Sequence, residues 1–409
     1  MNNYSSDKYI QNTSLTLFQL SLLLLLATSI VRFSSSMYLP ALLKIGSELN
    51  LSDNLISQTL TIFYIFFAIS TLFVGPIVDS YGRKNAIMIG AVVFIFGSLL
   101  CANSTSWESL MIGRIFQAVG TSFIPVASRA MLRDLCNDRQ IISILGWMAL
   151  LGGVIPIIAP VLGGVIIKFL SWRYIFWFLS LFSTTSLIFI IAKLPNSVSK
   201  DKLKPFNIKI VLENYLFILK SPKFFIIVTP LALAFSIQGA YLVTSPFIFM
   251  QHFKLSPIEF GLINVIIVLS MFSGKYIASY TIKKRGIFAA YTLGAFLTFV
   301  GALCISITVA FGLDTIHIII TLLSVMISGY GTLLPIGVKS IMTAFKDHAG
   351  ITSALHGFVT LGMTAIGSLI VTQIRDFYQT SYIDSLNIFL LPTVILLVIS
   401  AFFTKEHLI

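Results

Sequence analysis

The chain has 409 residues, of which 57% are hydrophobic and only 10% are charged. Soluble globular domains carry roughly 25% charged residues, so this composition and the mean hydropathy of +0.95 exclude a water-soluble globular protein. The three cysteines (Cys101, Cys136 and Cys304) are far apart and have neither metal-binding nor redox spacing. No metal site is expected.

Apolar runs of about 20 residues, each long enough to cross a bilayer as a helix, recur along the whole chain. The first is too long, and lacks the small-residue cleavage pattern, for a removed signal peptide. The sequence predicts twelve membrane helices, near residues 16–39, 54–76, 86–102, 107–131, 141–167, 171–192, 224–250, 257–281, 287–311, 316–338, 350–373 and 385–404.

The net charge of +12 is placed unevenly. With twelve spans and the N-terminus inside, most lysines and arginines fall in the inner segments, as the positive-inside rule requires. We therefore expect a multi-pass protein of the bacterial inner (plasma) membrane with both termini cytoplasmic. The excess charge orients the protein in the lipid bilayer, and no nucleic-acid partner is expected.

The longest polar interruption, residues 193–224, divides the chain into six spans and six spans. We predict an N-terminal six-helix bundle (1–193), a cytoplasmic linker (194–223) and a C-terminal six-helix bundle (224–409). The linker segment IKIVLENYLFILK has apolar residues at helical spacing and is expected to form a short amphipathic helix.

A weak internal repeat supports this division. FVGPIVDSYGRK (73–84) aligns without gaps to FSGKYIASYTIKK (272–284), which pairs Gly75 with Gly274 and Lys84 with Lys283. IPVASRAM (124–131) similarly matches LPIGVKSIM (334–342), which pairs Pro125 with Pro335. Two six-helix pseudo-symmetric halves are typical of transporters that move by rocking.

The stretch GPIVDSYGRK fits the pattern G-x-x-x-D-x-x-G-R-K. In this it resembles the major facilitator superfamily, and the rest of the chain resembles its bicyclomycin and chloramphenicol resistance type of drug/proton antiporters. The resemblance implies the major facilitator fold and gating roles for this loop. Gly75 would allow close helix contact, Gly82 a tight turn, and Asp79 would pair with Arg83, beside Lys84, in a latch that breaks in the other conformation.

Two further motifs resemble this family. RIFQAVG in span four has Arg114 and Gln117 where relatives place residues for proton coupling or substrate contact, although a buried arginine that only binds backbone carbonyls is an alternative.

Span five resembles the exporter signature of the superfamily, and its prolines and glycines would let the helix bend and pack closely. Its residues are Pro156, Pro160, Gly163 and Gly164. The segment RAMLRDL adds Arg129 as a gating candidate.

The sequence MYLPAL also resembles this subfamily, but Ser36 stands where relatives typically have an aspartate for cation handling. None of the fifteen acidic residues lies near the middle of a predicted span. Arg32 shares a helix face with Ser36, and we expect it to join Arg114 in a positively charged cavity that favours an anionic substrate. Lys275 and His356 are further candidates for this cavity. Alternatively, Arg32 points to the outer water, and Lys275 extends toward the cytoplasmic surface.

Other polar side chains are candidates for the same cavity. The residues expected to bind substrate are Arg32, Ser36, Tyr38, Arg114, Gln117, Gln238, Tyr241 and His356. His356 is also the fallback protonation site, unless it only packs.

These features predict a secondary active transporter that works by alternating access and is driven by a proton or substrate gradient without a cofactor. We expect a monomer that exports an anionic small molecule, such as a polycarboxylate metabolite or siderophore. The alternatives are a broad multidrug/proton antiporter and a non-transporting sensor on the same scaffold. No catalytic constellation and no phosphate-binding loop occurs, so neither an enzyme nor an ATP-driven pump is expected.

Overall fold

The computed structural model describes residues 16–198, 203, 207–345 and 348–404, and these form helices and short connections. Both chain termini lie outside the described residues. The elements in chain order are α2 (Leu17–Ser36), η1 (Leu39–Ala41), α3 (Leu42–Glu48), α4 (Asp53–Tyr81), α5 (Arg83–Ala102), α6 (Trp107–Leu135), α7 (Asp138–Phe169), α8 (Arg173–Lys193), α9 (Ile208–Leu219), α10 (Pro222–Pro246), η3 (Phe247–His252), α11 (Pro257–Ala310), α12 (Ile316–Ala344), α13 (Ala349–Tyr378) and α14 (Tyr382–Phe403).

Twelve segments of this chain are long and apolar enough to span a membrane. Eleven helices of the described residues meet that condition, and α11, with 54 residues, contains two spans. As one straight helix α11 would extend about 80 Å, but Gly286 interrupts it with a φ of +86°. The prediction of an all-helical, twelve-span membrane protein is therefore confirmed.

The first span is longer than predicted. It runs from Leu17 to Glu48 as one membrane-length unit, whereas the predicted run stopped at residue 39. Pro40 lies in the short η1 turn between α2 and α3 and does not end the span. Arg32 lies near the middle of this unit, beside Gly152 of α7.

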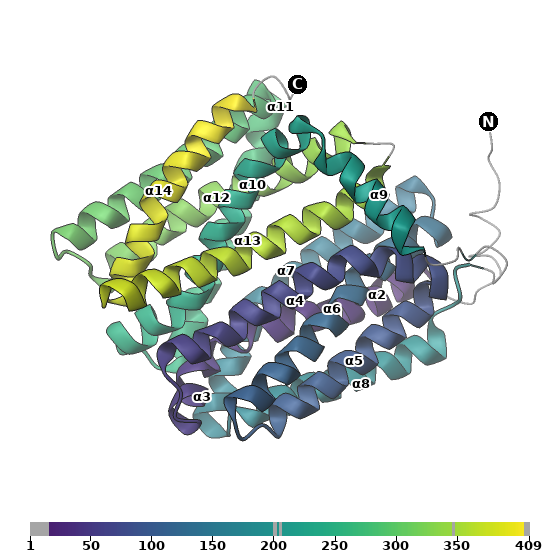
Figure 1. The fold of residues 1–409 in the computed structure, drawn as a ribbon, viewed down its shortest axis with the longest axis horizontal. Coiled ribbons are helices and arrows are strands. Elements are labelled where there is room, and N and C mark those ends of the chain that lie inside the picture. Colours follow the sequence, from purple (N-terminus) through teal and green to yellow (C-terminus); the bar gives the residue numbers. More distant parts are fainter. Residues whose placement is uncertain (1–15, 199–202, 204–206, 346–347, 405–409) are drawn as a thin grey trace.

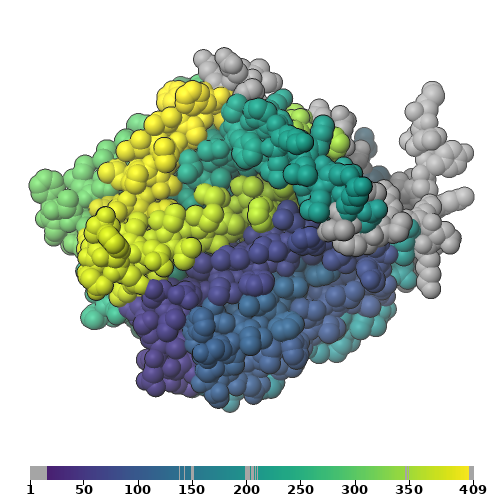
Figure 2. All heavy atoms as spheres, viewed as in Figure 1, coloured from purple at the N-terminus to yellow at the C-terminus, as the bar shows by residue number. Residues whose placement is uncertain are grey.

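The spans pack as two groups. Helices α2 and α4–α8 contact one another, as do α10–α14, and the groups meet mainly where α4 packs on α13 and α7 packs on α11. Figure 1 shows α4 and α13 lying side by side across the molecule, and Figure 2 shows their atoms forming a continuous seam. The bundle boundaries at residues 193 and 224 remain predictions.

The structure shows one further likeness between the two halves. Gly82 ends α4 with φ +87° and ψ 153°, and Gly286 turns α11 with φ +86° and ψ 172°. Only glycine adopts this φ readily, so each turn depends on its glycine. The pairing of Gly75 with Gly274 and of Lys84 with Lys283 stays a prediction.

The predicted amphipathic helix is present as α9. Its Tyr215 hydroxyl donates a hydrogen bond to the Leu72 carbonyl of α4, and burial raises the pKa of Tyr215 to about 12, so this donor keeps its proton at neutral pH. Ile218 of the same helix is fully buried. The linker is thus anchored to one end of the bundle, which we call the linker end; the opposite end is the Arg375 end.

Close packing near the Arg375 end depends on glycines in α7. A Cβ placed on Gly163 would lie 2.4 Å from the Met37 carbonyl oxygen, and one on Gly164 would lie 2.4 Å from that of Pro257. Gly163 thus lets α7 approach the first span, and Gly164 lets it approach α11 of the other group. Both glycines perform the packing role expected of them, while Pro156 and Pro160 lie inside the continuous helix.

We expect Gly164→Ala to destabilise the protein by about 1–3 kcal/mol, because the added methyl group would overlap the Pro257 carbonyl. The matched control is Gly146→Ala in the same helix, whose Cβ would meet open space. Thermal unfolding of the detergent-purified variants measures the difference. Equal melting temperatures for the two variants would contradict this account of the contact between the two groups.

Candidate functional site

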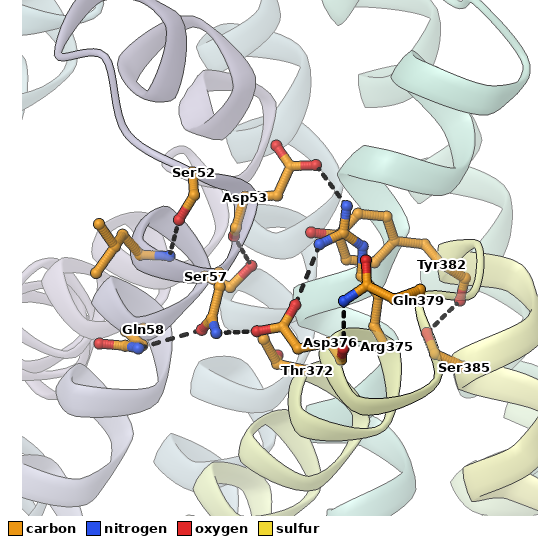
Figure 3. A network of polar contacts seen from close by, with 12 residues as sticks. Ser52, Asp53, Ser57, Gln58, Thr372, Arg375, Asp376, Gln379, Tyr382 and Ser385 are labelled. Carbon is orange, nitrogen blue, oxygen red and sulfur yellow. Dashed lines mark hydrogen bonds and ion pairs between the residues drawn. The ribbon is translucent and has the colours of Figure 1, made fainter.

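A polar network joins the two groups of helices at the Arg375 end (Figure 3). Arg375 of α13 donates to Asp53 of α4 at 3.1 Å and to Asp376 at 3.4 Å. Asn54 of α4 donates to the same Asp376 carboxylate, and the Arg375 guanidinium lies 4.3 Å from the centre of the Tyr382 ring. Among the described residues, Asp53 and Arg375 form the ion pair that crosses between the groups.

The same seam continues deeper into the protein. The hydroxyl groups of Thr61 on α4 and Ser368 on α13 are hydrogen-bonded at 2.7 Å, and both residues are buried. The sequence analysis kept all acidic residues away from the middle of the spans but did not pair Asp53 with Arg375. The only signal available was opposite charge at the ends of spans two and eleven, which does not specify a partner.

The predicted Asp79–Arg83 ion pair is present at the linker end, with an additional partner, and its role as a latch stays a prediction. Arg83 pairs with Asp79 at 3.1 Å and with Asp134 of α6 at 2.7 Å. Ser197 donates to the same Asp134 carboxylate at 2.9 Å, and Lys84 donates to a carbonyl oxygen near the end of α8 at 3.0 Å. These contacts tie spans two, three, four and six together within one group of helices.

Gly75 does not make the close helix contact expected of it. A Cβ on Gly75 would meet nothing within 4 Å, whereas one on Gly357 of α13 would lie 2.9 Å from the Thr71 methyl carbon of α4. Helices α4 and α13 are therefore in close contact at Thr71. At Gly75, one turn nearer the linker end, there is room for a side chain. A role for Gly75 in close packing can apply only to another conformation.

Arg114 is enclosed in protein and is fully buried. Its guanidinium lies 4.4 Å from the Tyr38 ring centre and 4.3 Å from that of Phe63, and it donates to Gln117 Oε1 at 2.8 Å and to the Ser34 carbonyl at 3.4 Å. The Nε and Nη2 atoms have no hydrogen-bond partner. The alternative in which Arg114 binds only backbone carbonyls thus accounts for one of its contacts, to Ser34. The rings of Tyr38 and Phe63 provide two more.

Arg32 lies elsewhere, and its side chain is exposed. A Cβ on Gly152 of α7 would be 3.6 Å from Arg32 Nε, and one on the next residue, Gly153, would lie 2.5 Å from the Phe272 ring. Lys275 Nζ of α11 lies 4.7 Å from the centre of that same ring. The structure therefore places Arg32 and Lys275 beside the same turn of α7, whereas the expected partner Arg114 is enclosed by other residues.

The remaining candidates are divided between the two groups of helices. Ser36 is partly buried, and the Tyr38 hydroxyl bonds Thr59 at 2.7 Å. Gln238 accepts a hydrogen bond from Tyr330, whereas Tyr241 is buried in the core of its own group.

The two remaining candidates nearer the linker end are Arg129 of α6 and His356 of α13. Arg129 donates to the Pro125 carbonyl of its own helix at 3.1 Å. The buried His356 Nε2 has no hydrogen-bond partner.

Acidic residues are found only toward the ends of the described spans or outside them, as the sequence predicted. The described residues also contain no group of three His, Cys, Asp or Glu side chains that could hold a metal ion. The interior of the spans therefore offers its cations aromatic rings, amides and carbonyl oxygens, but no carboxylate.

Known proteins share this architecture. The peptide transporter POT in complex with sulfate has a TM-score of 0.75 at 14% identity, with 97% of each chain covered. A bacterial homolog of the human lysosomal transporter Spinster, inward-facing and unoccupied, has a TM-score of 0.74 at 13% identity, with 96% of this chain and 97% of that chain covered. At these identities the likeness concerns the fold alone.

Sequence comparisons give the family. The bicyclomycin resistance protein homolog of Haemophilus influenzae is 27% identical over 256 residues, which are 62% of this chain and 64% of that protein, a little under two thirds of its length. Multidrug resistance protein MdtL of Klebsiella pneumoniae is 33% identical over 141 residues, 34% of this chain and 36% of that one. The Major Facilitator Superfamily profile matches residues 24–368. The chain therefore belongs to the Major Facilitator Superfamily.

Proposed function

We propose that this protein is a secondary active exporter of an anionic small molecule and that Arg32 contacts the substrate. The observation that carries the proposal is an exposed arginine near the middle of a membrane span in a protein whose described span interiors hold no acid. A charged group at that depth is costly and is usually functional. Carboxylate or phosphate groups, which arginine binds in a bidentate manner, would supply the missing negative charge. A polycarboxylate metabolite or siderophore fits this description.

The contacts between the helix groups support a conformation that is closed at the Arg375 end. The Asp53–Arg375 ion pair and the Thr61–Ser368 hydrogen bond join α4 to α13 toward the Arg375 end. Near the linker end, no atom would lie within 4 Å of a Cβ on Gly75. The linker end is rich in lysine and arginine and is therefore assigned to the cytoplasm. The cavity would then open inward, as it does in the Spinster homolog.

Export is favoured over uptake because this chain resembles relatives that are named as resistance proteins. A proton or substrate gradient would drive the cycle, and no cofactor is required. We place the protein in the bacterial inner membrane with both termini cytoplasmic, and we expect the monomer to be the transporting unit.

A broad multidrug/proton antiporter is the second candidate, and the names of the same relatives favour it. In that case Ser36 is a tolerated loss of the usual acid, and His356 is the available proton acceptor. The two candidates differ in the charge of the transported molecule, so a comparison of cells with and without the gene separates them.

For the anion exporter, we expect cells that lack the gene to retain an anionic compound that wild-type cells release. Complementation with Arg32→Gln should reduce export of that compound at least about tenfold, since removal of one partner from a charged contact costs a few kcal/mol. Mass spectrometry of cell extracts and spent medium, in rich and iron-poor conditions, measures the export.

Arg285→Gln, which changes an exposed arginine at the linker end, is the matched control and should export normally. The anionic proposal fails if anions are released equally with and without the gene while cationic dyes accumulate in its absence. It also fails if Arg32→Gln exports the retained anion at the wild-type rate.

We expect Arg375→Gln to open the Arg375 end more often, because it removes the ion pair between the helix groups. A cysteine placed at Ser368, which is buried beneath the network, should then react faster with a membrane-impermeant maleimide added outside the cell. Mass spectrometry of the labelled protein gives the rate. Cys304 is replaced by serine because it is only partly buried.

Arg173→Gln is the control for this experiment. It removes an ion pair with Glu48 at the same end but within one group of helices. If Arg173→Gln and Arg375→Gln raise the labelling rate equally, the effect is a general loosening, and the Asp53–Arg375 pair is not a closing contact.

A further inference from the structure

Two cations from different groups of helices face the same region in the middle of the membrane spans. Arg32 belongs to α2 and Lys275 to α11, and both side chains lie beside helix α7 at two consecutive glycines. A Cβ on Gly152 would lie 3.6 Å from Arg32 Nε, and one on Gly153 would lie 2.5 Å from Phe272 Cζ. Lys275 Nζ in turn lies 4.7 Å from the centre of the Phe272 ring.

The surroundings of this pair do not neutralise it. The ion pairs of the described residues leave out both Arg32 and Lys275, and all of the described acids lie toward the span ends or outside the spans. The Phe272 ring offers the ammonium group only a partial attraction. Because Arg32 and Lys275 lie beside consecutive residues of α7, their like charges repel each other where the surroundings are of low polarity.

We propose that Arg32 and Lys275 bind one anion together, each from its own group of helices, and that Lys275 is a specificity-determining residue for this transporter. This inference rests on the proposed anionic substrate and adds its second contact. A planar guanidinium binds one carboxylate or phosphate in a fixed orientation, whereas an ammonium group accepts a wider range of geometries. The pair therefore suits a molecule with two acidic groups, or one doubly charged group.

The arrangement also links the substrate to the motion. When the two groups of helices approach each other around the site, the empty cations are forced together, and this opposes closure. An anion between them converts the repulsion into two attractive contacts, so the loaded transporter closes more readily than the empty one.

A charge-reversal experiment tests the pairing without any ligand. In the purified protein, Lys275→Glu should form an ion pair with Arg32 and melt at a higher temperature than Lys275→Gln. The difference should vanish when Arg32 is also changed to Gln, because the partner is gone. If glutamate and glutamine variants melt alike with Arg32 present, or differ equally without it, the two side chains do not share a site.

A binding experiment with citrate as the probe tests the anion. At constant ionic strength, citrate should raise the melting temperature of the wild-type protein, and Arg32→Gln and Lys275→Gln should each weaken its apparent affinity at least about tenfold. Lys284→Gln is the matched control, since Lys284 Nζ lies 4.6 Å from the Tyr280 ring on the same helix. It should behave as wild type.

The outcomes separate the two proposals. If Arg32→Gln loses the response to citrate and Lys275→Gln keeps it, the role of Lys275 is overturned while the anion exporter stands. If tetraphenylphosphonium stabilises the wild-type protein and citrate does not, the anionic substrate is wrong and the shared anion site falls with it, whereas the charge-reversal result still reports whether the side chains meet.

Discussion

The constraint on which the rest of this structure depends is the lack of carboxylates inside the membrane spans that the structure describes. A cation at that depth has to be stabilised by something other than an ion pair. Arg114 uses two aromatic faces, an amide and a carbonyl oxygen. Arg32 and Lys275 lack such an enclosure. Arg114 is therefore held by protein groups, whereas Arg32 and Lys275 are the two cations to which we propose that a ligand binds.

The acids that the chain does have are used at the two ends of the bundle. At the linker end, Asp79 and Asp134 hold Arg83 within one group of helices, which makes that group a firm unit. At the Arg375 end, Asp53 holds Arg375 of the other group. Interactions within a group keep it rigid, while interactions between groups are the ones that have to break during transport, so the same chemistry serves two purposes.

Much of the fold follows from the sequence because the bilayer imposes a simple rule of length and polarity. The twelve spans, the linker helix and the Asp79–Arg83 pair all come from local patterns. The site was harder to predict. Charge alone made Arg32 and Lys275 candidates for one positive cavity, but spacing could not show that they lie beside the same turn of α7 and that Arg114 does not join them. That pairing depends on Gly152, Gly153 and Phe272, whose contacts between helices leave no periodic signal.

The enclosure of Arg114 has a consequence for how this protein can vary over evolutionary time. A lysine at this position would keep the charge but lose the flat surface that fits between Tyr38 and Phe63, so the usual conservative exchange is unfavourable here. A change at any one of these three positions would leave the others mismatched. The three residues, which come from the first, second and fourth spans, should therefore be inherited as a set and replaced together or not at all.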